Sequence, residues 1–182
     1  RLGTGVFAGC SNLSEVQFDE GLEIIGADAF LYCEALQQVT LPSSVIRLGT
    51  GVFAGCSNLS EVQFDEGLEI IGADAFLYCE ALQQVTLPSS VTKLGDCAFQ
   101  GCSSLTKVEF NEGMQIIADL YAFRFCSALR SVTIPSSVTT LGHQTFANCT
   151  NLSEVILLGG GRLLNEKFLD RGLFSGQGVL NH

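Results

Sequence analysis

The sequence is short of basic residues and has no long apolar run, and each shortage excludes a class of function. Its 182 residues include 9 lysines and arginines against 19 aspartates and glutamates, a formal net charge of −10. A chain of this charge without a basic patch is a poor ligand for nucleic acids and anionic membrane surfaces. No apolar stretch reaches the roughly 18 residues that a spanning helix needs, so no membrane insertion is expected.

The acidic residues are concentrated in the first half of the chain. Residues 1–92 contain two arginines and twelve acids, whereas residues 93–182 contain seven bases and seven acids. One interpretation is that a basic partner binds near the first four repeat units. The other is that the acids only keep an apolar repeat protein in solution.

The residue patterns of catalysis and metal binding are also missing. His143 and His182 stand apart from any Cys/His or Asp/His cluster at metal-ligand spacing. Gly159-Gly160-Gly161 lacks both nucleotide-binding glycine patterns, and we interpret it as a break where the repeat decays. The pairs Asp19-Glu20 and Asp65-Glu66 lack the D-x-D-x-D-G pattern of a calcium loop. We therefore expect no enzyme activity, no metal and no cofactor.

What the sequence does contain is a 23-residue repeat. Residues 1–45 recur unchanged as residues 47–91, and each block divides into two similar units. Seven units of 23–24 residues begin near 2, 25, 48, 71, 94, 117 and 141, and together they span 1–163. One unit cannot bury its own apolar side chains, whereas stacked units share a continuous core. The sequence predicts a repeat solenoid, with 164–182 as a degenerate repeat or C-terminal cap.

Each unit contains a strand signal and turn signals. In L-x-x-V-x-L/F, as at Val16 and Phe18, apolar and polar residues alternate as in a half-buried strand. The stretch G-A-D-A-F-L-Y-C is too short for a full helix and predicts one helical or 3₁₀ turn. We therefore expect an arc with a parallel β-sheet on one face and short helical or 3₁₀ turns on the other. The sixth unit has one extra residue, and Ala118 replaces its glycine, which predicts a local bulge.

The cysteines follow the repeat rather than a metal motif. Seven of the eight occupy one repeat column, and Cys97 lies outside it. The spacing predicts a buried ladder of free thiols that act as small apolar side chains. Neighbouring thiols could approach disulfide distance, but seven equivalent ones cannot all pair. The column consists of Cys10, Cys33, Cys56, Cys79, Cys102, Cys126 and Cys149.

The pattern G-x-x-A-F-x-x-C-x-x-L-x-x-V-x-L-P-x-S-V resembles the BspA-like leucine-rich repeats over residues 1 to about 158. That family is associated with surface antigens and adhesins that contact other proteins or host matrix. The resemblance implies a leucine-rich repeat solenoid that is a non-enzymatic scaffold for protein interaction or adhesion. It also implies a cell-surface or secreted location, whereas a ladder of free thiols favours an intracellular one. In the second unit the pattern is Gly26, Ala29, Phe30, Cys33, Leu36, Val39, Leu41, Pro42, Ser44 and Val45.

The candidate partner-binding surface is the outward side of the predicted strands. Its polar side chains predict many weak contacts with a protein partner of unknown identity, although the same pattern suits a solvated sheet. One alternative is a glycan-binding module, against which the lack of outward aromatic residues counts. Another is a structural segment that self-associates through an uncapped N-terminal coil around Leu2, Val6 and Phe7. The candidate residues are Glu15, Gln17, Gln38, Thr40, Glu61, Gln63, Gln84, Thr86, Lys107, Glu109, Ser131 and Thr133.

Overall fold

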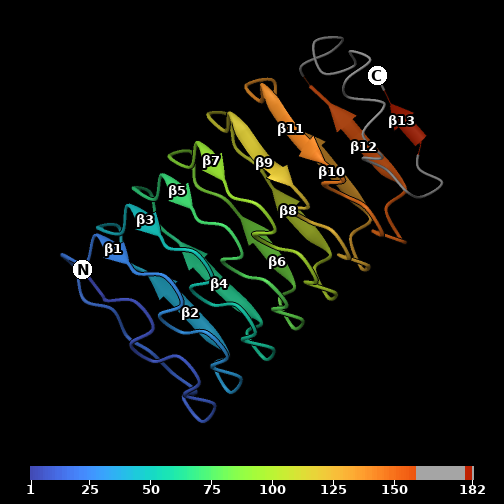
Figure 1. Cartoon of the computed structure of the whole chain (residues 1–182). Helices are drawn as coiled ribbons and strands as arrows, with labels where there is room; N and C mark the ends of the chain where they lie inside the picture. The colour runs from blue at the N-terminus through green and yellow to red at the C-terminus, as the bar shows by residue number, and fades with distance from the viewer. Residues whose placement is uncertain (159–178, 182) are drawn as a thin grey trace.

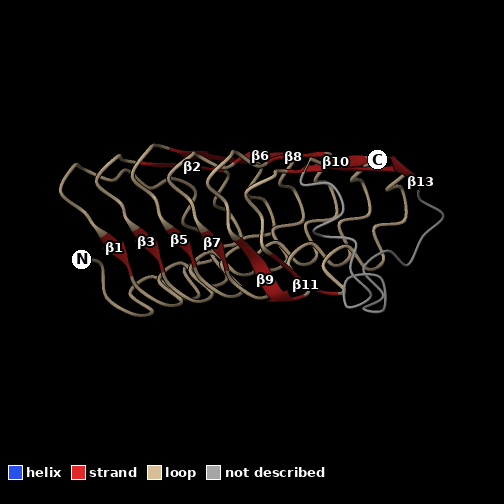
Figure 2. Cartoon of the chain, turned by 90° about the horizontal axis from the view of Figure 1, so that it is seen from above, coloured by secondary structure: helices blue, strands red, loops and turns tan. Residues whose placement is uncertain are grey.

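The structure, a computed structural model, describes residues 1–158 and 179–181, and it is a solenoid of stacked coils (Figure 1). One repeat unit makes one coil, and we number the coils one to seven from the unit starts given above. The N-terminus lies at one end of the stack and residues 179–181 lie at the other (Figure 2). The described residues contain no helix that could cross a membrane.

The predicted strands form one side of the solenoid in coils two to seven, whereas the strand expected around Val16 and Phe18 in the first coil is absent. Residues that pair between neighbouring strands on this side are one repeat apart in the sequence, as in Gln38↔Glu61 and Gln84↔Lys107, and the strands pair in parallel. The pairs β2–β4 and β6–β8 form two small sheets, and β10, β12 and β13 form a third. The strands are β2 (Gln38–Leu41), β4 (Glu61–Phe64), β6 (Gln84–Thr86), β8 (Lys107–Glu109), β10 (Ser131–Ile134), β12 (Glu154–Leu157) and β13 (Val179–Asn181).

A second parallel sheet, not expected from the sequence, joins the first residues of consecutive units. Its six strands pair in chain order on a different side of the coils (Figure 2). Most are only two residues long, because the chain turns away directly after the Ile or Leu that enters the core. They are β1 (Ile24–Ile25), β3 (Arg47–Leu48), β5 (Ile70–Ile71), β7 (Lys93–Leu94), β9 (Ile116–Leu120) and β11 (Thr140–His143).

The predicted helical or 3₁₀ turns are wrong: residues 1–158 and 179–181 contain no helix of either kind. In the second coil Asp28 and Tyr32 have φ of 55° and 57°, which is the left-handed region. These positive φ angles interrupt a right-handed helical run on both sides of residues 29–31. The amides of Asp28, Phe30 and Tyr32 donate instead to carbonyls of the third coil, at 2.8–2.9 Å. Hydrogen bonds between coils thus alternate with isolated turns within the coil, such as Leu31 N to Asp28 O at 3.1 Å, and no helix forms.

The predicted bulge in the sixth unit is confirmed. Leu141 pairs with Ile117, but His143 pairs with Leu120, so β9 has one more residue than β11 between the two pairs. Ala118 lies in this irregular stretch with φ of 42°. The extra residue lengthens β9 rather than breaking the stack.

The core is a set of parallel columns that runs the length of the stack. Phe residues of successive coils stack with ring centroids 5.0–5.6 Å apart. The predicted free-thiol ladder is confirmed: every cysteine is free, and six of the seven ladder thiols are buried. Cys56 Sγ donates to Phe30 O at 3.2 Å, and Cys79 Sγ to Phe53 O at the same distance. Cys10, in the open first coil, is exposed.

The predicted cap over 164–182 falls almost wholly outside the described residues. The backbone of 179–181 forms β13, which pairs in parallel with β12 at Val155↔Leu180. The extent of the repeat region and the role of 164–182 stay predictions.

Candidate partner-binding surface

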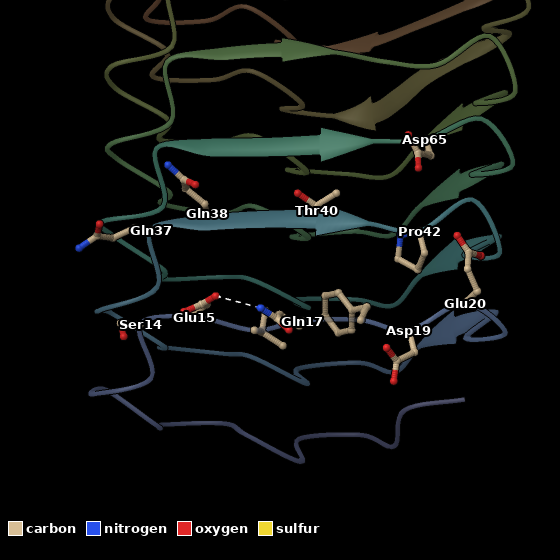
Figure 3. A pocket seen from close by; sticks show the side chains of 12 residues that line it. Ser14, Glu15, Gln17, Asp19, Glu20, Gln37, Gln38, Thr40, Pro42 and Asp65 are labelled. Atoms are coloured by element: carbon tan, nitrogen blue, oxygen red, sulfur yellow. Dashed lines mark hydrogen bonds between the residues drawn. The ribbon is translucent and has the colours of Figure 1, made fainter.

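The twelve predicted surface residues lie on one side of the solenoid, and all are exposed. Along each strand they alternate with buried residues, as in β2, where Gln38 and Thr40 point outward while Val39 and Leu41 enter the core. Because the coils stack with equivalent residues one repeat apart, the twelve residues form two parallel rows across six coils. Figure 3 shows the start of both rows at Glu15 and Gln17.

The two rows are linked by hydrogen bonds within and between coils. Gln17 Nε2 donates to Glu15 Oε1 at 3.2 Å, and Gln63 Nε2 donates to Glu61 Oε1 at 2.7 Å. Each amide therefore holds its neighbouring carboxylate in place. Such a carboxylate still has lone pairs that can accept bonds from a partner.

The fifth coil differs from the first and third. Lys107 Nζ lies 2.5 Å from Glu109 Oε1, and Thr86 Oγ1 donates to Glu109 Oε2 at 2.9 Å. The hydrogen bond from Lys107 lowers the pKa of Glu109, and the bond from Thr86 adds to that effect. This carboxylate is thus neutralised within the chain, whereas Glu15 and Glu61 have no basic residue at the corresponding place.

The polar surface contains two equivalent hollows, one over coils one and two and the other over coils three and four. Their volumes are about 830 and 630 Å³. At the floor of each hollow, Phe18 or Phe64 turns its ring edge-on to the Phe column, with centroids 5.8–5.9 Å apart. Pro42 and Pro88 lie at one edge, and Figure 3 shows the first hollow with the Gln, Glu and Thr side chains around it.

One of the acidic pairs considered for calcium contributes a structural carboxylate. Glu66 accepts hydrogen bonds from Ser89 N at 3.2 Å, Ser89 Oγ at 3.0 Å and Ser90 N at 3.3 Å. The bond from the Ser89 backbone is the main reason that the pKa of Glu66 is lowered. Glu112 holds the turn at Ser136 in the same way. These carboxylates fasten the Pro-Ser-Ser turn of the following coil, a role that the sequence analysis missed.

No group of three or more His, Cys, Asp or Glu side chains within residues 1–158 and 179–181 is placed to hold a metal ion. Cys97, the cysteine outside the ladder, is half-buried. Burial raises its pKa to about 11, and the carboxylate of Asp74 adds to the increase. At neutral pH this thiol is therefore protonated and a weak nucleophile.

Comparisons with known proteins agree with this architecture. The family model described as BspA type leucine rich repeat region matches six copies, over residues 1–96 and 69–170. The crystal structure of a leucine-rich repeat protein of T. pallidum is similar, with a TM-score of 0.72 and 29% sequence identity over 90% of this chain and 83% of that one. No curated protein sequence matches the chain.

A leucine-rich repeat protein from Bacteroides ovatus is also similar, with a TM-score of 0.56 and 25% identity. The match covers 74% of this chain and 40% of that one, so this chain spans less than half of that protein. Repeat scaffolds of this kind generally bind proteins and are typically non-enzymatic. On the family match and the shared fold, the chain belongs to the BspA-type leucine-rich repeat family.

Proposed function

We propose that this protein is a non-enzymatic interaction or adhesion scaffold that binds a macromolecular partner through the two polar rows. The observation that carries the proposal is the exposure of all twelve row residues on one regular, rigid surface. A rigid surface loses little conformational entropy when it binds, so weak polar contacts repeated over several coils add up to a useful affinity. No row residue is aromatic, which favours a protein over a glycan as the partner.

Charge complementarity indicates a basic partner surface. The carboxylates of Glu15 and Glu61 are held by amides rather than by bases, and the hollows beside them contain further acids at Asp19 and Asp65. Opposite charge on a partner accelerates association and fixes the register of the complex. We therefore expect the strongest contacts at coils one to four.

The test is capture of partners from the native source by the intact chain, compared with a triple variant that reverses Glu15, Glu61 and Glu109 to Lys. A partner that the intact chain retains and the variant loses supports the proposal. The matched control reverses Glu23 and Glu69, which are exposed outside both the rows and the turn side, and it is compared with a double variant that reverses Glu15 and Glu61, so that both change the charge equally. Equal loss with both variants would mean that binding depends only on the net charge of the chain. Equal retention of the partner by both variants would mean that the two rows do not take part in binding.

A second candidate function, self-association through the first coil, rests on a comparison of identical sequences. Val6 in the first coil is 49% exposed, whereas its copy Val52 in the third coil is fully buried beneath the second coil. We expect a concentration-dependent increase in sedimentation coefficient that Val6→Glu abolishes. A monomer at every concentration would contradict this candidate and leave the sheet-face proposal unaffected.

A further inference from the structure

The side of the solenoid formed by the turns presents a row of aromatic side chains that the proposed function does not use. Tyr32, Tyr78 and Phe125 are 58%, 49% and 40% exposed. They occupy one repeat column in coils two, four and six, and the coils between them have Gly55 and Gly101 in that column. Exposed aromatic residues therefore recur every second coil, about 10 Å apart along the solenoid axis.

The fold itself does not require these aromatic residues. Tyr32, Tyr78 and Phe125 have φ of 57°, 56° and 63°, a left-handed conformation that is unfavourable for large side chains. Gly55 and Gly101 adopt the same region, with φ of 71° and 77°, at no steric cost. The chain thus keeps strained and exposed aromatic side chains where glycine serves the backbone better, which is typical of a binding site.

Each tyrosine ring packs against the glycine of the following coil and occupies the space that a side chain there would need. A Cβ on Gly55 would lie 2.3 Å from Tyr32 Cδ1, and a Cβ on Gly101 would lie 2.3 Å from Tyr78 Cδ1. The rings therefore lean over the bare backbone of coils three and five. A ring that is already oriented loses little entropy when a ligand packs against it.

Acidic residues accompany the two tyrosines. Glu34 and Glu80 each follow a tyrosine by two residues, and both are exposed. Near Phe125 the charge changes sign, because the Arg124 guanidinium lies 4.5 Å from the centre of the Phe125 ring. The combination of an aromatic ring and a carboxylate thus occurs in coils two and four.

We propose that this row is a second docking surface, and that it binds an extended, proline-rich segment with basic residues in the polyproline II conformation. Such a segment advances about 9 Å in each three-residue turn, which matches the two-coil spacing of Tyr32 and Tyr78. Prolines pack against the tyrosines, as in other aromatic-lined grooves that bind this conformation. Lysine or arginine in each turn meets Glu34 and Glu80. A neutral glycan would use the rings and leave these carboxylates without a partner.

The test uses synthetic peptides and isothermal titration of the intact chain. The probe is Arg-Pro-Pro repeated three times, and the charge control is Arg-Gly-Gly repeated three times. The test variant is Tyr32→Gly with Tyr78→Gly, which installs the residue that coils three and five already have, so that folding is preserved. We expect the probe to bind the intact chain, and the variant to weaken binding at least about ten-fold, or about 1.4 kcal/mol.

Three results would overturn this proposal. Equal binding of both peptides would mean that charge alone drives the interaction. Full binding by the double variant would mean that the tyrosine rings do not contribute to it. Binding of a β-linked glucose oligomer that is lost in the double variant, without binding of the proline peptide, would assign the row to glycans. The sheet-face variant with Glu15, Glu61 and Glu109 reversed must keep its affinity for the peptide. Failure of one surface is thereby distinguished from failure of the other.

Discussion

At the scale of the residue, the glycine in the second position of six of the seven units decides how closely two coils approach. A Cβ on Gly49 would lie 2.5 Å from Ala27 N and 2.6 Å from Gly26 C, both of them backbone atoms. No rotamer change can relieve such a collision, so the glycine is required by contact between backbones. At Ala118, in the same column, the chain instead bulges.

We predict that Gly49→Ala lowers the free energy of unfolding by about 1–3 kcal/mol, because the added methyl group pushes two coils apart. Gly3→Ala is the matched control, since Gly3 occupies the same column in the first coil and the nearest atom to its Cβ is Val6 Cγ2 at 3.3 Å. We expect little effect there. Urea unfolding followed by circular dichroism measures both values, and equal losses would contradict the role of coil-to-coil contact.

A second prediction at the residue scale concerns the strained tyrosines. Tyr32→Gly removes the steric cost, about 1 kcal/mol, of a large side chain in the left-handed conformation. It also removes the contact between the tyrosine ring and the third coil. The two effects oppose each other, so we expect the melting temperature to change little. Tyr32→Val should instead lower it clearly, because a β-branched residue is least compatible with this conformation. Scanning calorimetry of both variants is the measurement, and a similar loss in both would argue against strain.

At the scale of the element, the thiol ladder makes stability depend on alkaline pH. Burial raises the pKa of Cys56 to about 12, and the nearby Cys33 adds to it. Burial likewise raises the pKa of Cys79 well above its ordinary value, with smaller contributions from neighbouring thiols. The unfolded thiols, with a pKa near 9.0, lose their protons first. The stabilisation is therefore complete below pH 9 and is lost as the pH rises toward the folded-state values.

We predict a loss of about 1 kcal/mol for each buried thiol at a pH one unit above the unfolded pKa. Urea unfolding between pH 7 and 10.5 measures the slope. A variant with Cys56→Ala and Cys79→Ala should give a flatter profile, although it is less stable at neutral pH. An identical slope in both proteins would assign the pH dependence to other groups.

At the scale of the whole molecule, the position of a coil within the stack decides how much its core residues contribute. Phe76 is completely buried and stacks between Phe53 and Phe99, with centroids 5.5 and 5.0 Å away. Phe7 stacks only on Phe30, because no coil precedes the first one in this structure. In a one-dimensional stack, each coil is stabilised by its neighbours and by nothing further away.

We therefore predict that Phe76→Ala costs about 3–5 kcal/mol. Phe7→Ala should cost roughly half as much, because it removes the contact with one neighbour instead of two. Denaturant midpoints and their slopes measure both. Equal costs would mean that the solenoid is not a nearest-neighbour stack.

Much of the fold could be predicted from the sequence, because its main signals repeat in phase. The alternation of apolar and polar residues predicted the longer strands of coils two to seven, although none forms around Val16 and Phe18, and the same periodicity placed the twelve row residues outside and all of the Cys column except Cys10 inside. The helical or 3₁₀ turn was wrong because its prediction rested on the length of the stretch around Phe30 alone. Whether an amide such as that of Phe30 donates within its own coil or to the next one depends on the distance between coils.

The repeat by itself determined that coils stack in register, because only stacking buries columns of identical apolar residues. The tertiary structure alone decided what lies between coils: the second sheet, the left-handed turns, the hollows above Phe18 and Phe64, and the position of Tyr32 over Gly55. These features depend on contacts between residues about 23 positions apart. A pattern within one unit indicates which side chains are apolar, but it does not determine the distance and orientation of the next unit.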